Sequence, residues 1–479
     1  MPERAGYLPG LDPAALQWQT LTFGRTGTAL AVEVPVLGAG DMTRLAAHVR
    51  QQAAERLRPL PVARVVEAVD AAIARLLDRS DPYRRRMDDL LPIVTGYDRE
   101  MVRLGLTQYL KTFRKPELLR FLAEDFANPA MLDDFQPLPK GGFGKAFGPP
   151  LLAHIWAGNV PGLPLWTQVS GLLVKAGGIG KVPSAEPLFA TWFAQLLAEV
   201  APDLAGCLAV VWWQGGEEAP ERALLQAADL TLAYGSNASL AAIQSRMPPA
   251  KRFLAYGHKV SFAMIAAAAL DPAKAGDTAR RAAYDVARYD QQGCFAPHVV
   301  FVEHGGAITP RTFARYLARE LAAFGERYPR RGLTMAEAGS VAAWRQREEF
   351  THGGEVLGDE AGTWSVSYQE GGAGFGPSCL NRAVRVVAVD NLADVPAQVA
   401  PYRTLLQTVG IAAPPGDLFR LAEALGEAGV TRIAALGDMT APEAGWHHDG
   451  RFNLLDLVQI TEIDARAEPA ADRLAPYAD

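Results

Sequence analysis

The sequence predicts an α/β protein in which parallel sheets are covered by helices. Short apolar runs alternate with helical segments over residues 151–265, and a second block of the same alternation begins near residue 266. Parallel strands need a crossover connection, which is usually a helix, so this alternation is typical of βαβ units. The chain of 479 residues is long enough for two or three such domains. The sequence contains no repeat at a fixed period, so a solenoid is not expected.

Composition narrows the class of protein. The net charge of -6, from 47 basic and 53 acidic residues, gives no electrostatic footprint for nucleic acid or an anionic membrane surface. The apolar run at 260–270 is far shorter than the roughly 20 residues that a membrane span needs. The three cysteines, Cys207, Cys294 and Cys379, form no CxxC pair, so neither a disulfide framework nor a structural zinc site is expected. We therefore expect a cytoplasmic protein without a membrane span, a nucleic-acid partner or a metal.

The elements before residue 150 are expected to form a helical flank that packs on the first domain. A strand is expected at 30–38, followed by helices over 41–57 and 62–80 with apolar residues at three- and four-residue spacing. Asp41 is a plausible N-cap of the first helix. Residues 128–150 are rich in proline and glycine and predict a connection or extended arm.

The two alternating blocks predict the domains. The first contains the strand candidates LLAHIWA, CLAVVWW, LTLAYG, RFLAYG and KVSFAMI. The second contains the strand candidates HVVFVE, TWSVSYQ and AVRVVAVD, and helix candidates that include PAQVAPYRTLLQTV and DLFRLAEALGEAG. The expected domains are residues 1–265, residues 266–445, and a segment 446–479 that returns to the first. Sheets of this class bind ligands beyond the carboxyl ends of their strands.

One stretch, DQQGCFAPH at 290–298, predicts a reactive cysteine. Gly293 leaves the backbone beside Cys294 uncrowded, and Pro297 suits the first turn of a helix. A cysteine at a helix N-terminus has a stabilised thiolate, which a nucleophile requires. Cys207 and Cys379 lack such a setting and are assigned to structure.

The usual nucleotide motifs are missing. GGFG at 141–144 and GGIG at 177–180 both lack the third glycine of GxGxxG. Gly180 and Lys181 resemble the end of a P-loop, but Val182 stands where Ser or Thr is needed.

The order of several pieces nevertheless resembles a known family. AGNVPGLPLW, GGIGKVPSAEP, YGS, YGHK and DQQGCFAPHVVFV occur in that order over roughly 150–305, and LLQTVGIAA and GWHHDGRFNLLDLV follow near the C-terminus. The chain resembles the aldehyde dehydrogenase superfamily, and more closely the fatty acyl-CoA reductases that supply aldehyde in bacterial bioluminescence. The resemblance implies an aldehyde dehydrogenase-like fold, with a Rossmann-type cofactor domain and an α/β catalytic domain.

The resemblance also implies roles for single residues. Cys294 matches the nucleophile, and Asn159 matches the asparagine whose amide completes an oxyanion hole with the cysteine N–H. Lys181 matches the lysine that holds the adenosine ribose. Gly235 and Ser236 match the turn that opens a helix beneath the pyrophosphate. This superfamily binds its dinucleotide without GxGxxG, which accounts for the missing motif.

Two departures from the family pattern refine the prediction. Aligning on Gly257, a further cofactor-site candidate, and Lys259 puts Ala255 where hydrolytic relatives have a glutamate. Without that base, the acyl-cysteine should exchange with a thiol instead of being hydrolysed, unless a different carboxylate substitutes. Ser184 stands three residues after Lys181, where NAD-preferring relatives often have a glutamate; a carboxylate would repel a 2′-phosphate, so NADPH is expected over NADH.

Histidines give weaker candidates. CxxxH formed by Cys294 and His298 is a weak metal signal, and no metal site is expected. His447 and His448, in GWHHDG, are candidates for proton transfer because the resemblance makes that segment an active-site wall.

The resulting hypothesis is NADPH-dependent reduction of a fatty acyl-CoA to the aldehyde, with an acyl-cysteine intermediate and CoA as leaving group. The resemblance implies a homo-oligomer and, as partners, acyl-transferase or synthetase proteins. Two alternatives stay open: a CoA-independent aldehyde dehydrogenase that makes the acid, and a catalytically silent scaffold for acyl-activating partners.

Overall fold

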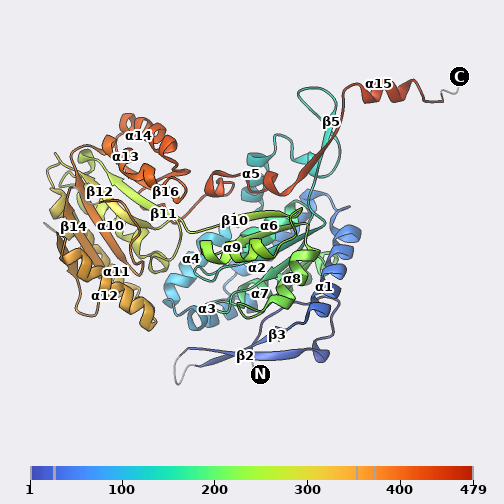
Figure 1. The fold of residues 1–479 in the computed structure, drawn as a ribbon, viewed down its shortest axis with the longest axis horizontal. Helices are drawn as coiled ribbons and strands as arrows, with labels where there is room; N and C mark the ends of the chain where they lie inside the picture. The colour runs from blue at the N-terminus through green and yellow to red at the C-terminus, as the bar shows by residue number, and fades with distance from the viewer. Residues whose placement is uncertain (1–2, 25–28, 352–353, 372–373, 477–479) are drawn as a thin grey trace.

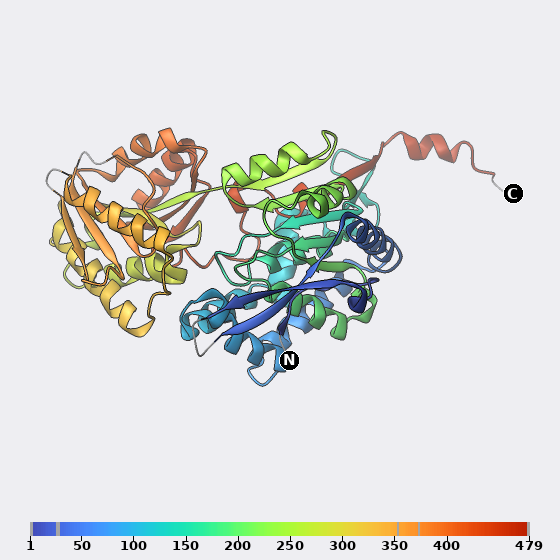
Figure 2. The same cartoon turned by 60° about the horizontal axis from the view of Figure 1, so that its bottom comes forward.

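The computed structural model describes residues 3–24, 29–351, 354–371 and 374–476. Over these residues the chain forms two α/β lobes, each built on its own mostly parallel sheet. Figure 1 shows the two lobes beside each other along the long axis, and Figure 2 shows the same arrangement turned by 60°. The α/β class with parallel sheets is therefore confirmed. None of the helices in the described part of the chain is long and apolar enough to cross a membrane.

The first lobe contains a five-stranded parallel sheet in the order β10-β9-β6-β7-β8. Its strands are β6 (Leu151–Ile155), β7 (Gly177–Lys181), β8 (Leu208–Val211), β9 (Leu230–Tyr234) and β10 (Arg252–Tyr256). Helices bury both faces, so the strands are mostly continuous apolar runs. One face is covered by α1 (Ala39–Gln52), α8 (Glu218–Ala227) and α9 (Asn237–Arg246). The other packs under α2 (Val62–Leu77), α3 (Pro82–Thr95), α4 (Arg99–Lys111), α5 (Lys115–Asp125), α6 (Pro164–Leu173) and α7 (Phe189–Val200).

The second lobe contains a seven-stranded sheet in the order β13-β14-β15-β12-β11-β16-β17, in which β13 alone runs antiparallel to its neighbour. Its strands are β11 (Val260–Ile265), β12 (Pro297–Glu303), β13 (Glu355–Gly358), β14 (Ser365–Glu370), β15 (Ala383–Val389), β16 (Leu406–Ala412) and β17 (Arg432–Ala435). The helices α10 (Ala275–Ala287) and α11 (Pro310–Arg327) cover one face, and α13 (Val395–Val399) and α14 (Pro415–Ala428) cover the other. The helix α12 (Met335–Glu349) lies against β13 and β14.

The change from one sheet to the other comes earlier than the sequence pattern predicts. β11 pairs with β12 and β16 of the second sheet, although the expected boundary after residue 265 puts it in the first domain. The chain crosses between the lobes over the three residues that separate Tyr256 from Val260. An apolar run such as KVSFAMI cannot reveal which of two sheets it joins, because both sheets bury their strands on both faces.

A second expectation, a helix over PAQVAPYRTLLQTV, is wrong in its second half. The helix α13 ends at Val399 and a short 3₁₀ turn follows, but Leu406–Ala412 is strand β16, in the interior of the second sheet. Short buried strands and helix segments cannot be separated by periodicity alone. The correction matters because β16 carries Gln407, which lines the cavity between the lobes.

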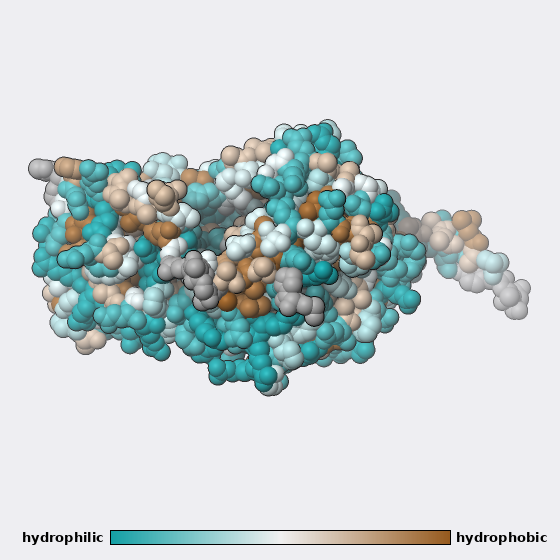
Figure 3. Space-filling model, turned by 90° about the horizontal axis from the view of Figure 1, so that it is seen from below, coloured by the Kyte–Doolittle hydropathy of each residue, from teal (hydrophilic) through white to brown (hydrophobic). Residues whose placement is uncertain are grey.

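Two small sheets complete the first lobe. β3 (Leu30–Val36), close to the strand expected at 30–38, pairs with β1 (Glu3–Arg4) and β2 (Gln17–Phe23). β18 (Gln459–Ile463) pairs antiparallel with β5 (Phe143–Phe147), which also pairs with β4 (Gln136–Pro137). The C-terminal segment thus lies against the proline- and glycine-rich connection of residues 128–150. Beyond it, α15 (Ala467–Asp472) extends clear of the body of the molecule (Figure 3).

Candidate active site

The main cavity lies where the two lobes meet and has a volume of about 670 Å³. Its wall comes from the loops after β6, β9 and β10, from α4, from the segment that contains Cys294, and from residues 440–449. The first three loops follow the carboxyl ends of parallel strands. In the first lobe, β7 and β9 lie on opposite sides of β6, so a crevice opens between β6 and β9 at the point where the strand order reverses. The cavity is therefore at the position where sheets of this class bind ligands.

Cys294 lines this cavity, but not at a helix N-terminus. It follows the 3₁₀ turn η6 (Arg288–Gln291) and precedes β12, and Pro297 is the first residue of that strand. The expected low-pKa thiolate at a helix start is therefore wrong in its geometry. Burial is the largest influence on the thiol and raises its pKa to about 11. The thiol is the form that predominates at neutral pH in the absence of substrate.

The turn before Cys294 has a strained backbone held by buried polar contacts. Tyr289, Asp290 and Gln291 have φ of 47°, 51° and 68°, in the left-handed region that non-glycine residues rarely adopt. Asp290 forms a 2.7 Å ion pair with Arg382, and both side chains are buried. Gln291 donates to the carbonyl of Ala383 at 2.9 Å and accepts from its N–H at 3.0 Å. These contacts fix the turn, and hence the direction in which Cys294 points.

Cys294 is also tied to the second sheet. Its carbonyl accepts a 2.7 Å hydrogen bond from the Ser261 hydroxyl on β11, and Ser261 in turn accepts from the N–H of Thr408 on β16 at 3.1 Å. The thiol therefore lies on a rigid frame, which a nucleophile requires for a defined line of attack.

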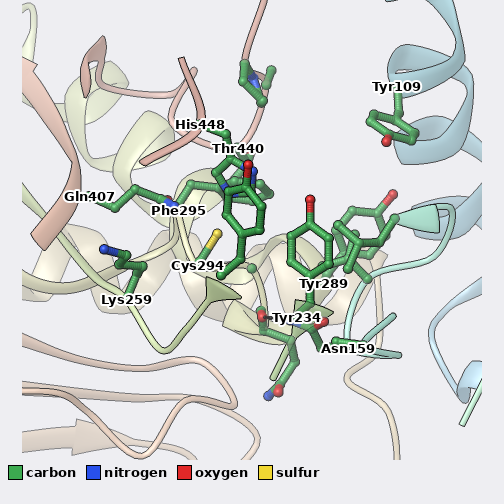
Figure 4. Close-up of a pocket in the computed structure, with 18 of the residues that line it drawn as sticks. Tyr109, Asn159, Tyr234, Lys259, Tyr289, Cys294, Phe295, Gln407, Thr440 and His448 are labelled. Carbon is green, nitrogen blue, oxygen red and sulfur yellow. Dashed lines mark hydrogen bonds between the residues drawn. The ribbon is translucent and has the colours of Figure 1, made fainter. Parts of the chain in front are cut away.

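Three polar residues that the sequence did not single out as site residues lie beside the thiol. Gln407 on β16 donates from Nε2 to Asp449 Oδ1 at 2.7 Å, and the Lys259 ammonium lies 3.8 Å from Asp449 Oδ2. A hydrogen bond from Gln407 and the positive charge of Lys259 lower the pKa of Cys294, whereas the negative charge of Asp449 raises it. Figure 4 shows Lys259 and Gln407 on the same side of Cys294. These three residues set the electrostatic environment of the Cys294 thiol.

Asn159, the expected oxyanion donor, follows β6 and lines the cavity. Its Nδ2 donates a 2.8 Å hydrogen bond to the carbonyl of Gln292, two residues before Cys294, and its own carbonyl accepts from the Tyr97 hydroxyl at 2.8 Å. An amide has two N–H donors, so one remains for a ligand. Asn159 is thus attached to the turn before Cys294 across the boundary between the lobes.

The two histidine candidates are separated. His448 lines the cavity and stacks on Tyr256, with ring centroids 4.5 Å apart and an interplanar angle of 22°. Burial lowers its pKa to about 4, so the ring is neutral at neutral pH. His447 is not among the residues that line the cavity; it packs edge-on against Phe452, with centroids 5.0 Å apart.

The residues expected to hold the cofactor lie along the carboxyl edge of the first sheet. Lys181 ends β7, and its ammonium lies 5.9 Å from the centroid of the Trp213 ring. Burial lowers the pKa of this lysine, and no carboxylate in the described chain lies within ion-pair distance of it. The Ser184 hydroxyl accepts from Trp212 Nε1 at 3.0 Å. Lys181 and Ser184 thus contact different indoles, and neither is among the residues that line the cavity.

The glycine-rich turns fit a dinucleotide as well. Gly235 and Ser236 line the cavity, and Ser236 is the N-cap of α9, its hydroxyl accepting from the N–H of Ser239 at 3.2 Å. The unpaired N–H groups of such a helix start bind phosphate. Gly257 also lines the cavity, and a Cβ there would lie 2.6 Å from Asn237 Oδ1, so a larger residue would displace the Asn237 side chain.

Ala255 does not face the cavity. Its side chain packs with the apolar cluster that includes Leu240 and Ile243 of α9, whereas the next residue, Tyr256, lines the cavity. The cavity wall continues through Gly257, His258 and Lys259. No carboxylate occurs in this segment, whatever its alignment with hydrolytic relatives.

Comparison with known proteins decides the family. Residues 57–460 match the model of a family described as acyl-CoA reductase (LuxC). The chain belongs to the LuxC family of acyl-CoA reductases. It is an acyl-reducing oxidoreductase, as the resemblance implied. Among its relatives is a long-chain acyl-protein thioester reductase of Aliivibrio fischeri, 26% identical over 389 residues, with 80% of this chain and 78% of the relative covered. Long-chain acyl-protein thioester reductase 2 of Photobacterium leiognathi is 25% identical over 387 residues, with coverage of 79% and 78%.

Solved structures confirm the fold of this LuxC family member. The aldehyde dehydrogenase KauB from Pseudomonas aeruginosa superimposes with a TM-score of 0.75 at 15% identity, and 97% of this chain and 96% of that one are covered. Aldehyde dehydrogenase 21 from Physcomitrella patens gives a TM-score of 0.73 at 14% identity, with coverage of 97% and 98%. The aldehyde dehydrogenase-like fold, with a Rossmann-type domain and an α/β catalytic domain, is therefore confirmed.

Proposed function

We propose that this LuxC family member reduces a fatty acyl thioester to the aldehyde with NADPH, through an acyl group carried on Cys294. The observation that supports this most directly is the placement of the thiol. Cys294 lies in a cavity between the lobes, with the amide of Asn159 hydrogen-bonded to its turn. The phosphate-binding features of α9 open into the same cavity.

The acylation step follows from the local charges. The sulfur attacks the thioester carbon, the carbon–sulfur bond to the donor breaks, and the donor thiolate leaves and takes up a proton. The free N–H of Asn159 and the backbone N–H of Cys294 stabilise the developing oxyanion. Lys259 and Gln407 favour the thiolate that must form for attack, because both lower the pKa of the thiol. Neutral His448 stacks over the site and excludes water from one side.

The cofactor's task is to deliver a hydride to the acyl carbon, after which the aldehyde is released and the thiol restored. Lys181 and Ser184 would hold the ribose and its 2′-phosphate, and Gly235, Ser236 and Gly257 would admit the pyrophosphate. Ser184 carries no charge, so it does not oppose a 2′-phosphate as a carboxylate would.

Two kinds of donor are consistent with the family. The family is described as acyl-CoA reductase, and the curated relatives are named as acyl-protein thioester reductases. We propose an acyl thioester as the substrate class, with either CoA or a partner protein's thiol as leaving group. A partner would then be an acyl-transferase or an acyl-protein synthetase. We also propose a homo-oligomer, since β18 is an edge strand whose residues are largely exposed.

The test is turnover of NADPH and NADH by purified protein with acyl-CoA thioesters of several lengths and with acylated carrier proteins, while the aldehyde is trapped. We expect turnover with at least one donor class, faster with NADPH, and none in Cys294→Ala. Cys379→Ala serves as the matched control, because Cys379 does not line the cavity. Acid formed from aldehyde without added thiol would contradict the proposal and favour an ordinary aldehyde dehydrogenase; no turnover with any donor would favour the scaffold.

A further inference from the structure

Arg288 is a buried cation whose partners are all neutral. It begins the turn that leads to Cys294, and only 6% of its surface is exposed. Its Nη1 donates to Gln108 Oε1 at 3.1 Å, to the Tyr284 hydroxyl at 3.3 Å and to the Thr440 hydroxyl at 3.3 Å. Its Nη2 donates to the carbonyl of Gly105 at 3.4 Å. These contacts orient the guanidinium without neutralising it.

The other buried cations of the described chain are paired with carboxylates. They are Arg84 with Asp88 at 2.9 Å, Lys175 with Asp133 at 2.5 Å, and Arg382 with Asp290 at 2.7 Å. Across the described ranges, no carboxylate oxygen lies within 4.0 Å of Arg288. A buried charge without a counter-ion is costly, so proteins seldom keep one unless a ligand completes it.

Arg288 lines the cavity that contains Cys294. Its neighbours there are Gln108 and Tyr109 of α4, and Thr440. Figure 4 shows Tyr109 across the cavity from Lys259, with Cys294 between them. The wall also includes the apolar residues Leu163, Pro442 and Ala444 and the charged residues Glu117, Arg120 and Glu443, none of which forms an ion pair with Arg288 in the described chain. Under the proposed function, Gly235, Ser236 and Gly257 would hold the dinucleotide, and the acyl donor is the ligand that would extend toward Arg288.

The same guanidinium also lines a second cavity of about 400 Å³ between α4, α10 and α11. Arg280 and Arg327 are in its wall, together with one carboxylate, Glu320, which pairs with Arg319 at 3.1 Å. This second cavity therefore supplies no counter-ion to Arg288 either. The unbalanced charge is available to a group that enters from the side of Cys294.

We propose that Arg288 forms a subsite for an anionic oxygen group of the acyl donor. Two sources share this chemistry: a carboxylate at the far end of the acyl chain, and a phosphate of CoA or of a carrier's pantetheine arm. A guanidinium binds either group with two parallel hydrogen bonds, and the Gln108 amide and the Thr440 hydroxyl offer further donors. The inference rests on the proposed function for the identity of the ligand, but the binding step can be measured without turnover.

The test measures binding to Cys294→Ala protein by titration calorimetry, so that no probe is consumed. Four probes are compared: the octanoyl and suberyl monothioesters of N-acetylcysteamine, octanoyl-CoA and suberyl-CoA. The first has no anion, the second only a carboxylate, the third only phosphates, and the last both. We expect at least one anionic source to bind about tenfold to hundredfold more tightly than the neutral probe, as charge-assisted hydrogen bonds imply.

Arg288→Met in the same background should abolish that gain and leave the affinity for the neutral probe within about twofold. Arg280→Met is the matched control, since Arg280 is an exposed arginine of the second cavity; it should keep the full gain. If Arg288→Met does not fold, Arg288→Lys keeps the charge but loses the bidentate geometry, and a partial loss confined to the anionic probes is expected.

Equal loss of affinity for neutral and anionic probes in Arg288→Met would overturn the inference, because that is what a purely structural arginine would give. Equal affinity of all four probes for Cys294→Ala protein would overturn it as well. Neither result touches the proposed function, which stands or falls with turnover by protein that retains Cys294. Conversely, anion-selective binding without any turnover would retain the subsite and refute the proposed reaction.

Discussion

The charge state of Cys294 yields a prediction that can be tested without any substrate. Its pKa is raised from the ordinary 9.0 to about 11, a shift that corresponds to about 2.7 kcal/mol. At pH 7 the thiolate fraction is then about one in ten thousand, instead of about one in a hundred. Because only the thiolate reacts, alkylation of Cys294 by iodoacetamide should be about a hundredfold slower than that of an unshifted thiol. The rate should rise about tenfold per pH unit through pH 10.

Two substitutions should move this rate in opposite directions. Asp449 is joined to the site by the 2.7 Å hydrogen bond from Gln407, and its negative charge raises the pKa of Cys294. Asp449→Asn should therefore lower the pKa of Cys294 and accelerate alkylation at pH 8, by about tenfold for each pKa unit that is removed. Lys259→Met should slow alkylation, since Lys259 lowers the pKa of Cys294.

The assay is alkylation followed by mass spectrometry of the peptide that contains Cys294, over pH 6 to 10. Resolving the peptides separates Cys294 from Cys207 and Cys379, which should react more slowly still, because burial raises the pKa of both thiols to about 12. A titration midpoint at or below pH 8 would refute the pKa. Rates that change in the same direction in both variants would refute the assignment of the charges around the thiol.

The remaining predictions concern the donor, the cofactor and stability. Asn159→Ala should lower the rate of aldehyde formation about a hundredfold while leaving the cofactor's KM nearly unchanged, as loss of an oxyanion donor implies. In steady-state kinetics, a rise in the cofactor's KM with an unchanged rate would contradict this role. Lys181→Met should raise the KM for NADPH, and Ser184→Glu should reverse the preference toward NADH, both measured by NAD(P)H oxidation. Asp290→Ala should lower the free energy of unfolding by about 3–5 kcal/mol, because it leaves Arg382 buried and unpaired, and adding Arg382→Met should recover part of it in urea denaturation.

The sequence predicted the parts of the site that follow directly from strands of the first sheet. The runs LLAHIWA and LTLAYG contain strands β6 and β9, and Asn159 and Gly235 lie just after these strands. Strand β7, which ends at Lys181, was not among the expected strands, because its sequence GGIGK has no apolar run. Because the carboxyl ends of parallel strands lie at the same edge of a sheet, residues that follow these strands can be expected to lie close together. The resemblance then named their roles, and the family and fold it implied are confirmed.

The charges around the thiol could not be inferred in the same way. Gln407 and Asp449 are more than a hundred residues from Cys294 in the chain, and they meet it because β16 is next to β11 in the second sheet. The order of strands in a sheet is not encoded in the periodicity of any one of them. The stretch containing Gln407 was in addition expected to be helical, which would have placed its side chain on a different surface. Lys259 lay in the recognised YGHK piece, but nothing local distinguished it from a surface lysine.

The helix expected at Pro297 shows the limit of local signals most clearly. Proline at a first helical turn and proline at a strand start both leave the missing N–H without cost, so the residue cannot decide between them. The strand expected at HVVFVE is confirmed and begins at Pro297; every position before its glutamate is buried, between β11 and β15. With the helix gone, no dipole lowers the pKa of Cys294, and Lys259 and Gln407 are the groups left to favour its thiolate.

The same charges bear on why an acyl group on Cys294 would be reduced or transferred instead of hydrolysed. Hydrolysis needs a base with a free lone pair directed at a water beside the acyl carbon. Ala255 faces away from the cavity, and the segment that follows it contains no carboxylate. Asp449 does line the cavity, but its two oxygens are directed at Gln407 and Lys259, at 2.7 Å and 3.8 Å. Its carboxylate thus adjusts the field at the sulfur, with Oδ1 engaged by Gln407. Glu117 and Glu443 also line the cavity, so the structure excludes a hydrolytic base only from the segment that begins at Ala255.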